Sequence, residues 1–199
     1  MFYKVIHALV SFYLRLFNRW EITGEENIPK SGPVVLVANH ISLWDPPFLA
    51  CSIRRPVHFM AKEELFKIPI LGRIIKALGA FPVKRGKPDR NALRLAAKYL
   101  EKGEILGLFP EGTRSKSGEL LQPHPGAALF ALRSGAPIVP VGLIGTRTTF
   151  PLTIRGNVRV KIGKPVVYPG LYNNKITNED LERVSAEIML KVKKLLEEK

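Results

Sequence analysis

Residues 33–52 read PVVLVANHISLWDPPFLACS, and this stretch decides the fold class. Its first part, Pro33–Ala38, is rich in β-branched residues, which is typical of a short strand buried on both faces of a sheet. The polar segment Asn39–Asp45 follows, and Pro46–Ser52 then reads as the start of a helix. The order strand, loop and helix is the repeating unit of α/β proteins.

The same alternation continues along the chain. The other expected strands are Ala80–Val83, Glu104–Phe109, Pro137–Ile144, Val158–Ile162 and Val166–Tyr168. The expected helical segments are Glu64–Leu78, broken at Pro69 and Gly72, then Asp89–Lys102, Gly126–Arg133, and a last helix opened by Thr177 and Asp180 in capping-box spacing. We therefore predict an α/β fold: a single domain with a central mixed sheet flanked by helices.

The first twenty residues, MFYKVIHALVSFYLRLFNRW, form a separate apolar and aromatic segment. Its polar side chains recur every three or four residues, at Lys4, His7, Ser11, Arg15 and Asn18, and so share one helical stripe. The uncharged run Val5–Leu14 is far shorter than the ~20 residues that span a bilayer, and no small-residue cleavage site follows. Two interpretations stay open: a helix packed on the core, or an amphipathic helix associated with a lipid surface.

The charge of the chain points to an anionic partner. The 199 residues carry 31 Lys and Arg against 17 Asp and Glu, a net charge of +14. Arg54–Arg94 alone holds eleven basic and three acidic residues. Nucleic acid, a membrane surface or a phosphorylated substrate would each fit this excess. The one cysteine, Cys51, excludes a disulfide framework and a thiolate-rich metal site, and we expect no metal.

His40 and Asp45 are the candidate pair for general-base chemistry, because they directly follow a buried strand. On a continuous helix, side chains five residues apart would lie about 140° apart and would not meet. The pair therefore requires His40 in a loop and a chain that folds back at Asp45 and its two prolines. The alternative is that Asp45 only caps the helix. His58 has Glu63 at the same offset but no preceding strand or turn, and we interpret His58 as structural.

Two further polar blocks follow expected strands. Phe109–Ser115 (FPEGTRS) supplies a carboxylate, a closely approachable backbone, a hydroxyl and a guanidinium, which together suit a polyol phosphate. Gly79–Gly86 ends with two cations that could meet a phosphate, Lys84 and Arg85. Taken alone, Phe109–Ser115 is more simply interpreted as a polar turn, and the alternative for Gly79–Gly86 is a solvated basic turn. The chain lacks GxGxxG, Walker-type, GxSxG, HExxH and CxxC patterns, so the sites that depend on them lose support.

These blocks, in this order, resemble the glycerolipid acyltransferase family, most closely the 1-acylglycerol-3-phosphate acyltransferases. The matching blocks are NHxSxxD at Asn39–Asp45, GxxxxxR at Gly79–Arg85, FPEGTRS at Phe109–Ser115 and a VPV-type block at Ile138–Gly142. The resemblance spans roughly Gly32 to Gly145. The chain departs from the family pattern at Lys84, often acidic or polar there, and at His124, which precedes Pro125 where lysine is frequent.

The resemblance implies a mechanism without a bound cofactor. His40 would deprotonate the free hydroxyl of a lysophospholipid, which then attacks an acyl thioester, and Asp45 would orient His40. Ser42 and Cys51 would not be nucleophiles. The resemblance also implies that Lys84, Arg85 and Arg114 bind the acceptor phosphate and that Glu111, Gly112 and Thr113 hold the glycerol part.

The resemblance further implies an acyl-CoA or acyl carrier protein donor and a membrane surface as partner. We expect a peripheral or monotopic protein on the cytoplasmic side of the cell membrane, with an interfacial helix at residues 1–24 and an acyltransferase domain at 25–199. Another acceptor, such as glycerol 3-phosphate or a different lysolipid, stays open. A non-catalytic nucleic-acid-binding module is the alternative of another class, but no helix-turn-helix, zinc-finger or RNA-recognition signature supports it, and we expect no nucleic-acid partner.

Overall fold

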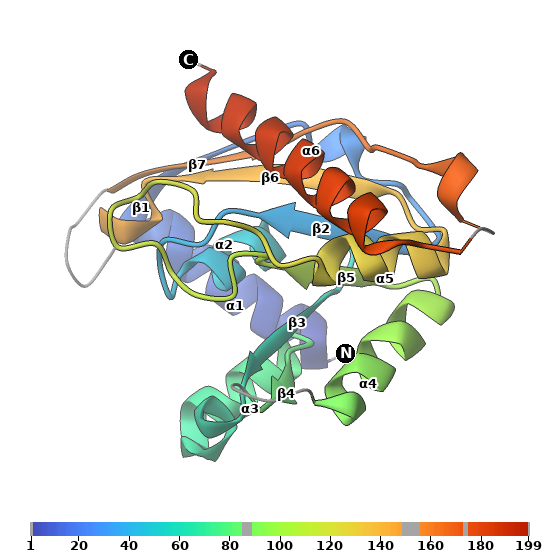
Figure 1. Ribbon diagram of the computed structural model, residues 1–199. Helices are drawn as coiled ribbons and strands as arrows, with labels where there is room; N and C mark the ends of the chain where they lie inside the picture. Colours follow the sequence, from blue (N-terminus) through green and yellow to red (C-terminus); the bar gives the residue numbers. More distant parts are fainter. Residues whose placement is uncertain (1, 85–88, 149–155, 173–174, 199) are drawn as a thin grey trace.

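The computed structural model describes residues 2–84, 89–148, 156–172 and 175–198 (Figure 1). The strands are β1 (Asn18–Thr23), β2 (Val34–Ala38), β3 (Val57–Lys62), β4 (Phe81–Val83), β5 (Ile105–Leu108), β6 (Ile138–Ile144) and β7 (Gly156–Ile162). The α-helices are α1 (Phe2–Phe17), α2 (Asp45–Cys51), α3 (Pro69–Ala77), α4 (Arg90–Glu101), α5 (Gly126–Ser134) and α6 (Asn178–Glu197). Four 3-10 turns complete the described elements: η1 (Glu25–Asn27), η2 (Glu63–Lys67), η3 (Thr146–Thr148) and η4 (Pro169–Leu171).

The strands form one seven-stranded mixed sheet in the order β1-β7-β6-β2-β5-β3-β4. β6 and β7 pair antiparallel, and the other neighbouring strands pair parallel. β2 lies in the middle, and all five of its residues are buried, as expected for a strand covered on both faces. Because β2, β5 and β3 run parallel, the loops after them meet at one edge of the sheet.

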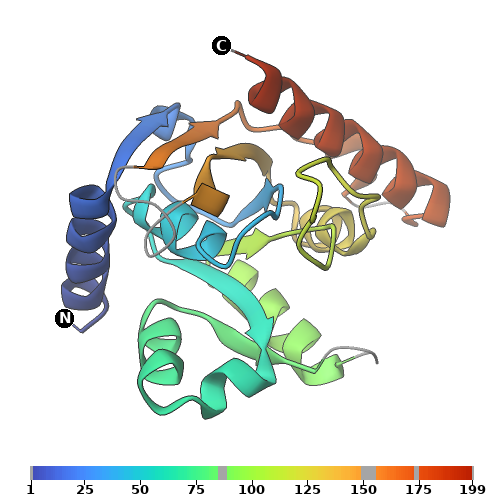
Figure 2. The same ribbon diagram turned by 90° about the vertical axis from the view of Figure 1, so that its left-hand side faces the viewer.

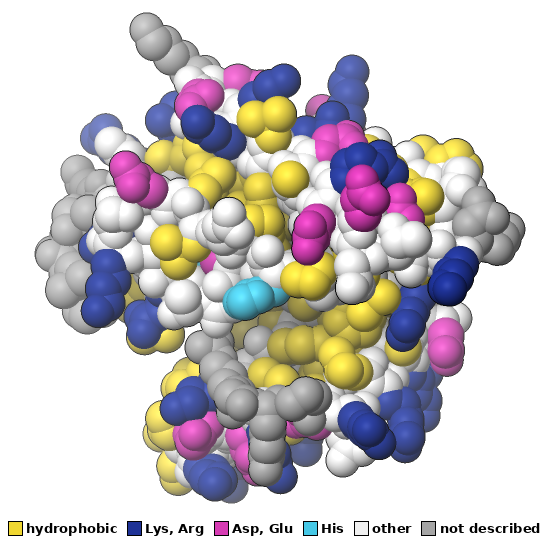
Figure 3. All heavy atoms as spheres, in the orientation of Figure 1, with side chains coloured by type: hydrophobic (Ala, Val, Ile, Leu, Met, Phe, Trp, Pro, Cys, Tyr) yellow, Lys and Arg dark blue, Asp and Glu magenta, His cyan; other side chains and the backbone are white. Residues whose placement is uncertain are grey.

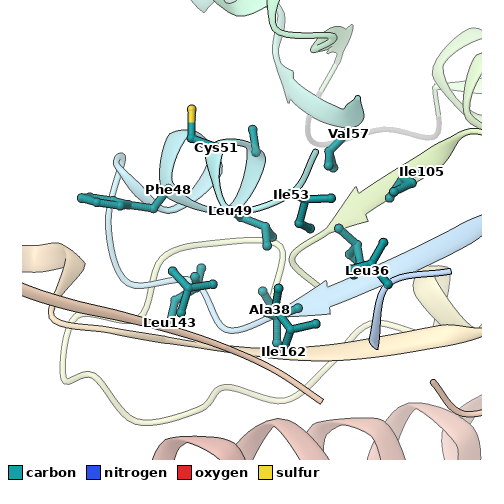
Figure 4. Packing of buried hydrophobic residues seen from close by; sticks show 14 of the residues in the cluster. Leu36, Ala38, Phe48, Leu49, Cys51, Ile53, Val57, Ile105, Leu143 and Ile162 are labelled. Carbon is teal, nitrogen blue, oxygen red and sulfur yellow. The ribbon is translucent and has the colours of Figure 1, made fainter. Parts of the chain in front are cut away.

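Helices cover both faces of the sheet (Figures 1 and 2). On one face, the core includes side chains of α1 and α2 packed against the central strands; Figure 4 shows Phe48 and Leu49 of α2 near Ala38 and Leu143. On the other face, α4, α5 and α6 contribute a second buried cluster, with Ala96 of α4 fully buried. This arrangement confirms the predicted α/β fold.

The helix boundaries largely follow the expected capping signals. Asp89 caps α4 by accepting hydrogen bonds from two backbone N–H groups of the first turn. Thr177 and Asp180 form the expected capping box at the start of α6. α3 begins at Pro69 as expected but continues through Gly72, where we expected a break. A Cβ at Gly72 would lie 2.4 Å from the backbone oxygen of Phe66, so the glycine allows η2 and α3 to pack closely.

Three strand expectations need correction. The expected strand Val166–Tyr168 is a single bridge between Val166 and Ile138, because prolines flank it and the Tyr168 N–H donates to the Tyr172 hydroxyl. β1 and β3 were not expected. The first helix ends at Phe17, where the Asn18 side chain donates to the Leu14 carbonyl. The chain then continues as β1, paired with β7, so residues 18–23 belong to the sheet.

α1 packs on the domain through Leu14, which is buried in the core, and through Val10 and Tyr13, which pack against it. The His7 Nε2 lies 3.3 Å from the Ala50 carbonyl oxygen, and the Cys51 thiol of α2 faces the His7 carbonyl. Burial raises the pKa of this thiol. Four apolar side chains of α1 are exposed instead: Val5, Leu9, Phe12 and Leu16. Among the described residues, no helix combines the length and apolar character needed to cross a membrane.

Candidate active site

His40 follows β2 directly, in the loop that connects this strand to α2. Its ring is nearly buried and stacks on Phe109, with ring centroids 4.2 Å apart. Its Nδ1 lies 2.7 Å from Oδ2 of Asp45. Because an ionised carboxylate only accepts hydrogen bonds, the hydrogen of a neutral His40 sits on Nδ1, and Nε2 keeps the lone pair that a general base needs.

Asp45 is the first residue of α2 and is fully buried. Its Oδ2 also accepts hydrogen bonds from the backbone N–H groups of Ile41 and Ser42, both at 2.7 Å. The carboxylate therefore turns back toward the His40 loop and does not cap the helix. Pro46 and Pro47 occupy the start of the helix, where a missing N–H costs nothing, and the chain makes the fold-back that the spacing requires.

Glu111 holds the backbone of His40. Its Oε1 accepts from the His40 N–H at 2.8 Å, and its Oε2 accepts from the Leu121 N–H at 3.0 Å. The Ser115 N–H in turn donates to the His40 carbonyl at 2.8 Å. Burial raises the pKa of the Glu111 carboxyl, and the two backbone donors oppose this rise. Both Glu111 oxygens are thus engaged within the chain, and the Phe109–Ser115 block lies against the His40 loop.

Three residues of this block, at positions 112–114, lie at the surface. Gly112 has φ = 66°, in the left-handed region, and its N–H closes a tight turn to the Phe109 carbonyl. A Cβ at Gly112 would lie 3.0 Å from the His124 ring, which would have to shift by a few tenths of an ångström. Thr113 and Arg114 are both exposed and accessible to a ligand.

The basic block after β4 lies farther from His40. β4 is three strands away from β2 in the sheet, which corresponds to about 14 Å. Lys84 is exposed, and its backbone N–H donates to Asp89. Arg85 lies outside the described residues. Contacts of the described residues therefore join His40, Asp45 and Glu111, whereas Lys84 stands at another point of the same sheet edge.

His58 forms a separate cluster and does not pair with Glu63. Its Nε2 lies 2.7 Å from Oε2 of Glu104, its Nδ1 lies 3.0 Å from the Gly79 carbonyl oxygen, and its ring stacks on Tyr99. Burial lowers the pKa of His58, and Glu104 opposes this effect. The contacts tie β3 to the segments before β4 and β5, as expected for a structural residue.

A family model described as Acyltransferase matches residues 19–144. The chain belongs to the acyltransferase family. A 1-acyl-sn-glycerol-3-phosphate acyltransferase of Bacillus subtilis is 32% identical over 165 residues, which cover 82% of each chain. A chloroplastic 1-acyl-sn-glycerol-3-phosphate acyltransferase of Brassica napus, BAT2, is 35% identical over 173 residues, covering 83% of this chain and 49% of that protein.

A solved structure supports the same assignment. The crystal structure of the 1-acyl-sn-glycerophosphate acyltransferase PlsC from Thermotoga maritima matches with a TM-score of 0.75 and 32% sequence identity, covering 98% of this chain and 81% of that one. This acyltransferase chain spans about half the length of the plant relatives that it matches. None of these matches supports the nucleic-acid alternative.

Two residues in contact with the candidate site were not assigned a role from the sequence. The Asn39 side chain both donates to and accepts from the backbone of Leu143, which joins the ends of β2 and β6. The Thr146 hydroxyl donates to Oδ1 of Asp45. The available signal was weak: Thr146 is a polar residue that closely follows an apolar strand, as His40 and Glu111 do, but nothing local links it to Asp45.

Proposed function

We propose that this chain is a 1-acylglycerol-3-phosphate O-acyltransferase that forms phosphatidic acid in phospholipid biosynthesis. The observation that carries the proposal is the His40–Asp45 contact of 2.7 Å. The His40 N–H donates to Glu111, and the Ile41 N–H donates to Asp45, so both residues are held in place. A histidine fixed in this way suits general-base catalysis on a hydroxyl, and the family matches give the reaction class.

In the proposed reaction, Nε2 of His40 takes the proton of the free acceptor hydroxyl as the hydroxyl oxygen attacks the thioester carbonyl carbon. The new ester C–O bond forms and the C–S bond breaks. The departing thiolate takes the proton back from the imidazolium, so no group stays on the protein. Asp45 orients the ring and stabilises its transient positive charge. The donor is an acyl-CoA or an acyl carrier protein thioester, and no bound cofactor is needed.

We assign acceptor binding to the surface residues near this pair. Arg114 is exposed on the block that holds His40, and its guanidinium suits a phosphate. Gly112 and Thr113 would hold the glycerol part beside it. We assign Glu111 a supporting role through the His40 backbone, because both of its oxygens already accept backbone hydrogen bonds. Lys84 and Arg85 would contact a phosphate from the β4 side.

An apolar hollow supports a lipid substrate. Figure 3 shows a depression lined by hydrophobic side chains, with a histidine at its rim. An acyl chain placed in such a hollow would be shielded from water, and its burial would contribute about 0.8 kcal/mol per methylene group.

We also propose that α1 and α3 dock this protein on a membrane, as a peripheral or monotopic protein. The exposed apolar residues of α1 recur every three or four positions and so form one stripe. α3 contacts α1 and adds exposed Ile70 and Leu71. Exposed Lys4, Arg15 and Arg73 could each add about 1 kcal/mol near an anionic leaflet.

The test of the proposed function is an acceptor and donor panel. Purified protein on anionic vesicles is given 1-acylglycerol 3-phosphate, other lysophospholipids or glycerol 3-phosphate, with either acyl-CoA or acyl carrier protein thioesters. Mass spectrometry identifies the products. We expect phosphatidic acid as the main product. A preference for another acceptor would replace the substrate assignment, and no acyl transfer from either donor would refute the proposed activity.

A further inference from the structure

The buried carboxylate of Asp45 divides its hydrogen bonds between its two oxygens. Oδ2 accepts hydrogen bonds from Nδ1 of His40 and from two backbone N–H groups of the His40 loop. Oδ1 faces the other way and accepts from the Thr146 hydroxyl at 2.5 Å, across 101 residues of sequence. Among the described residues, the donor to Oδ1 of Asp45 is the Thr146 hydroxyl. Asp45 and Thr146 both have 0% exposure, so water does not compete for this contact.

We propose that Thr146 is a positioning residue of the acyl-transfer reaction: its hydroxyl holds the Asp45 carboxylate in the orientation that presents Oδ2 to His40. This inference rests on the proposed function. The Thr146 hydroxyl acts on Asp45 and not on the reacting atoms, which separates its role from that of a catalytic residue.

The fold places Thr146 by means of three strand ends. The Asn39 side chain bonds to both backbone groups of Leu143, which fixes the end of β6 beside the end of β2. Gly145 then turns the chain with φ = 81°, and a Cβ there would lie 1.9 Å from the Asn157 carbonyl oxygen of β7. The next residue is Thr146. The ends of β2, β6 and β7 thus fix the position of its hydroxyl beside Asp45, and a precise site needs rigid support of this kind.

Orientation of the carboxylate matters because its terminal torsion is soft. Rotation about the Cβ–Cγ bond of an aspartate has broad, roughly two-fold minima. A donor on each side of the group removes this freedom. Without the hydroxyl, Oδ1 would be a buried acceptor with no partner, and the carboxylate would gain by rotating away from His40. A displacement of about 1 Å in such a group can cost about a hundredfold in rate.

The test compares Thr146→Val, which keeps the shape but loses the hydroxyl, with Thr146→Ser, which keeps the hydroxyl. We expect the valine variant to lower kcat about ten- to hundredfold with both KM values within about twofold, and the serine variant to recover kcat to within about threefold. Thr146→Ala, which only deletes atoms, takes the place of the valine variant if that variant does not fold. Ser52→Ala is the matched control, because it removes a buried hydroxyl just after α2 that donates to the Phe48 carbonyl. Its kcat should equal that of the wild type.

A second readout does not depend on turnover. In the histidine-labelled protein, the proton NMR signal of the His40 Nδ1–H should lie far downfield in the wild type and the serine variant, and move upfield or broaden without the Thr146 hydroxyl. Unchanged kcat and an unchanged signal in the valine variant would overturn the positioning role. If the wild type transfers no acyl group, the proposed function fails, while the NMR comparison still decides whether Thr146 positions Asp45.

Discussion

Gly107 of β5 lies at the start of a stack of rings that reaches His40. A Cβ added at Gly107 would lie 2.3 Å from Cε1 of Phe59 and within 2.8 Å of two more atoms of that ring. The Phe59 ring stacks on Phe109 at 5.9 Å, and Phe109 stacks on His40 at 4.2 Å. A single added methyl group at Gly107 should therefore displace rings that support the candidate general base.

The cost of Gly107→Ala follows from these distances. Carbon atoms pack best about 3.5–4.0 Å apart, so the Phe59 ring would have to move by more than about 1 Å. Phe59 is only 5% exposed, and the surrounding core leaves it little room. Overpacking of this kind costs about 1–3 kcal/mol, which for a domain of this size lowers the Tm by about 2–12 °C. We also expect a lower kcat, because the stack ends on His40.

Thermal unfolding and acyl-transfer rates of Gly107→Ala, Phe59→Leu and the double variant form the assay. The smaller leucine makes room for the methyl group, so the two changes should couple by about 1 kcal/mol or more in the direction of rescue. Gly126→Ala is the control: its Cβ meets no atom within 4 Å, and it should stabilise α5 slightly. If the two changes simply add, or if Gly107→Ala is as stable as the wild type, the inferred steric contact is wrong.

Three further predictions address membrane binding, acceptor binding and the N-terminal cap of α4. Phe12→Glu, at 67% exposure on α1, should lower binding to anionic vesicles in a flotation assay, because it places a charge in the apolar stripe. Arg114→Ala should raise the KM for the acceptor more than it lowers kcat, since Arg114 is assigned to the phosphate. The third variant, Asp89→Asn, replaces the charged cap of α4. In the wild type, backbone N–H groups, chiefly that of Lys84, lower the pKa of Asp89 below its ordinary value. The stability that the charged cap contributes over Asn should therefore be present above about pH 4 and disappear as the pH falls through the lowered pKa, as measured by chemical denaturation from pH 2 to 7.

Each of these predictions has a matched control. Leu190→Glu places the same charge at an exposed apolar site of α6, outside the stripe, and should leave vesicle binding unchanged; an equal loss in both variants would contradict the membrane surface. Arg133→Ala removes an exposed cation near the end of α5 and should leave the acceptor KM unchanged. An unaltered KM in the Arg114 variant would remove it from the phosphate site. A stability difference for Asp89 that persists at pH 2 would contradict the charged cap.

The central strand, its loop and the start of α2 could be predicted because their signals are local. β2 is buried on both faces and therefore reads as a continuous apolar run, and Pro46 marks the start of the helix. β1 (NRWEIT) and β3 (VHFMAK) carry weaker signals, because half-buried strands mix polar and apolar residues. Their strand state depends on the neighbours β7 and β5, which lie far away in sequence.

The contacts of the candidate site also differ in how far apart in sequence their residues lie. His40 and Asp45 lie five residues apart, so their spacing and the intervening turn gave a basis for pairing them. Glu111 lies 71 residues from His40, and its contact is with a backbone N–H, which no residue pattern reports. Thr146 lies 101 residues from Asp45 and reaches it only through the sheet order β6-β2. The tertiary contacts of Glu111 and Thr146, and the roles that follow from them, are therefore visible only once the fold is known.

The central claim is that His40 is the general base for acyl transfer to 1-acylglycerol 3-phosphate. The most direct measurement is the rate of phosphatidic acid formation by His40→Ala and by the wild type on the same vesicles, with thermal unfolding used to verify that both proteins are folded. We predict a rate lower by a factor of about 10²–10⁴ for the variant. A folded His40→Ala protein that forms phosphatidic acid at close to the wild-type rate would contradict the claim.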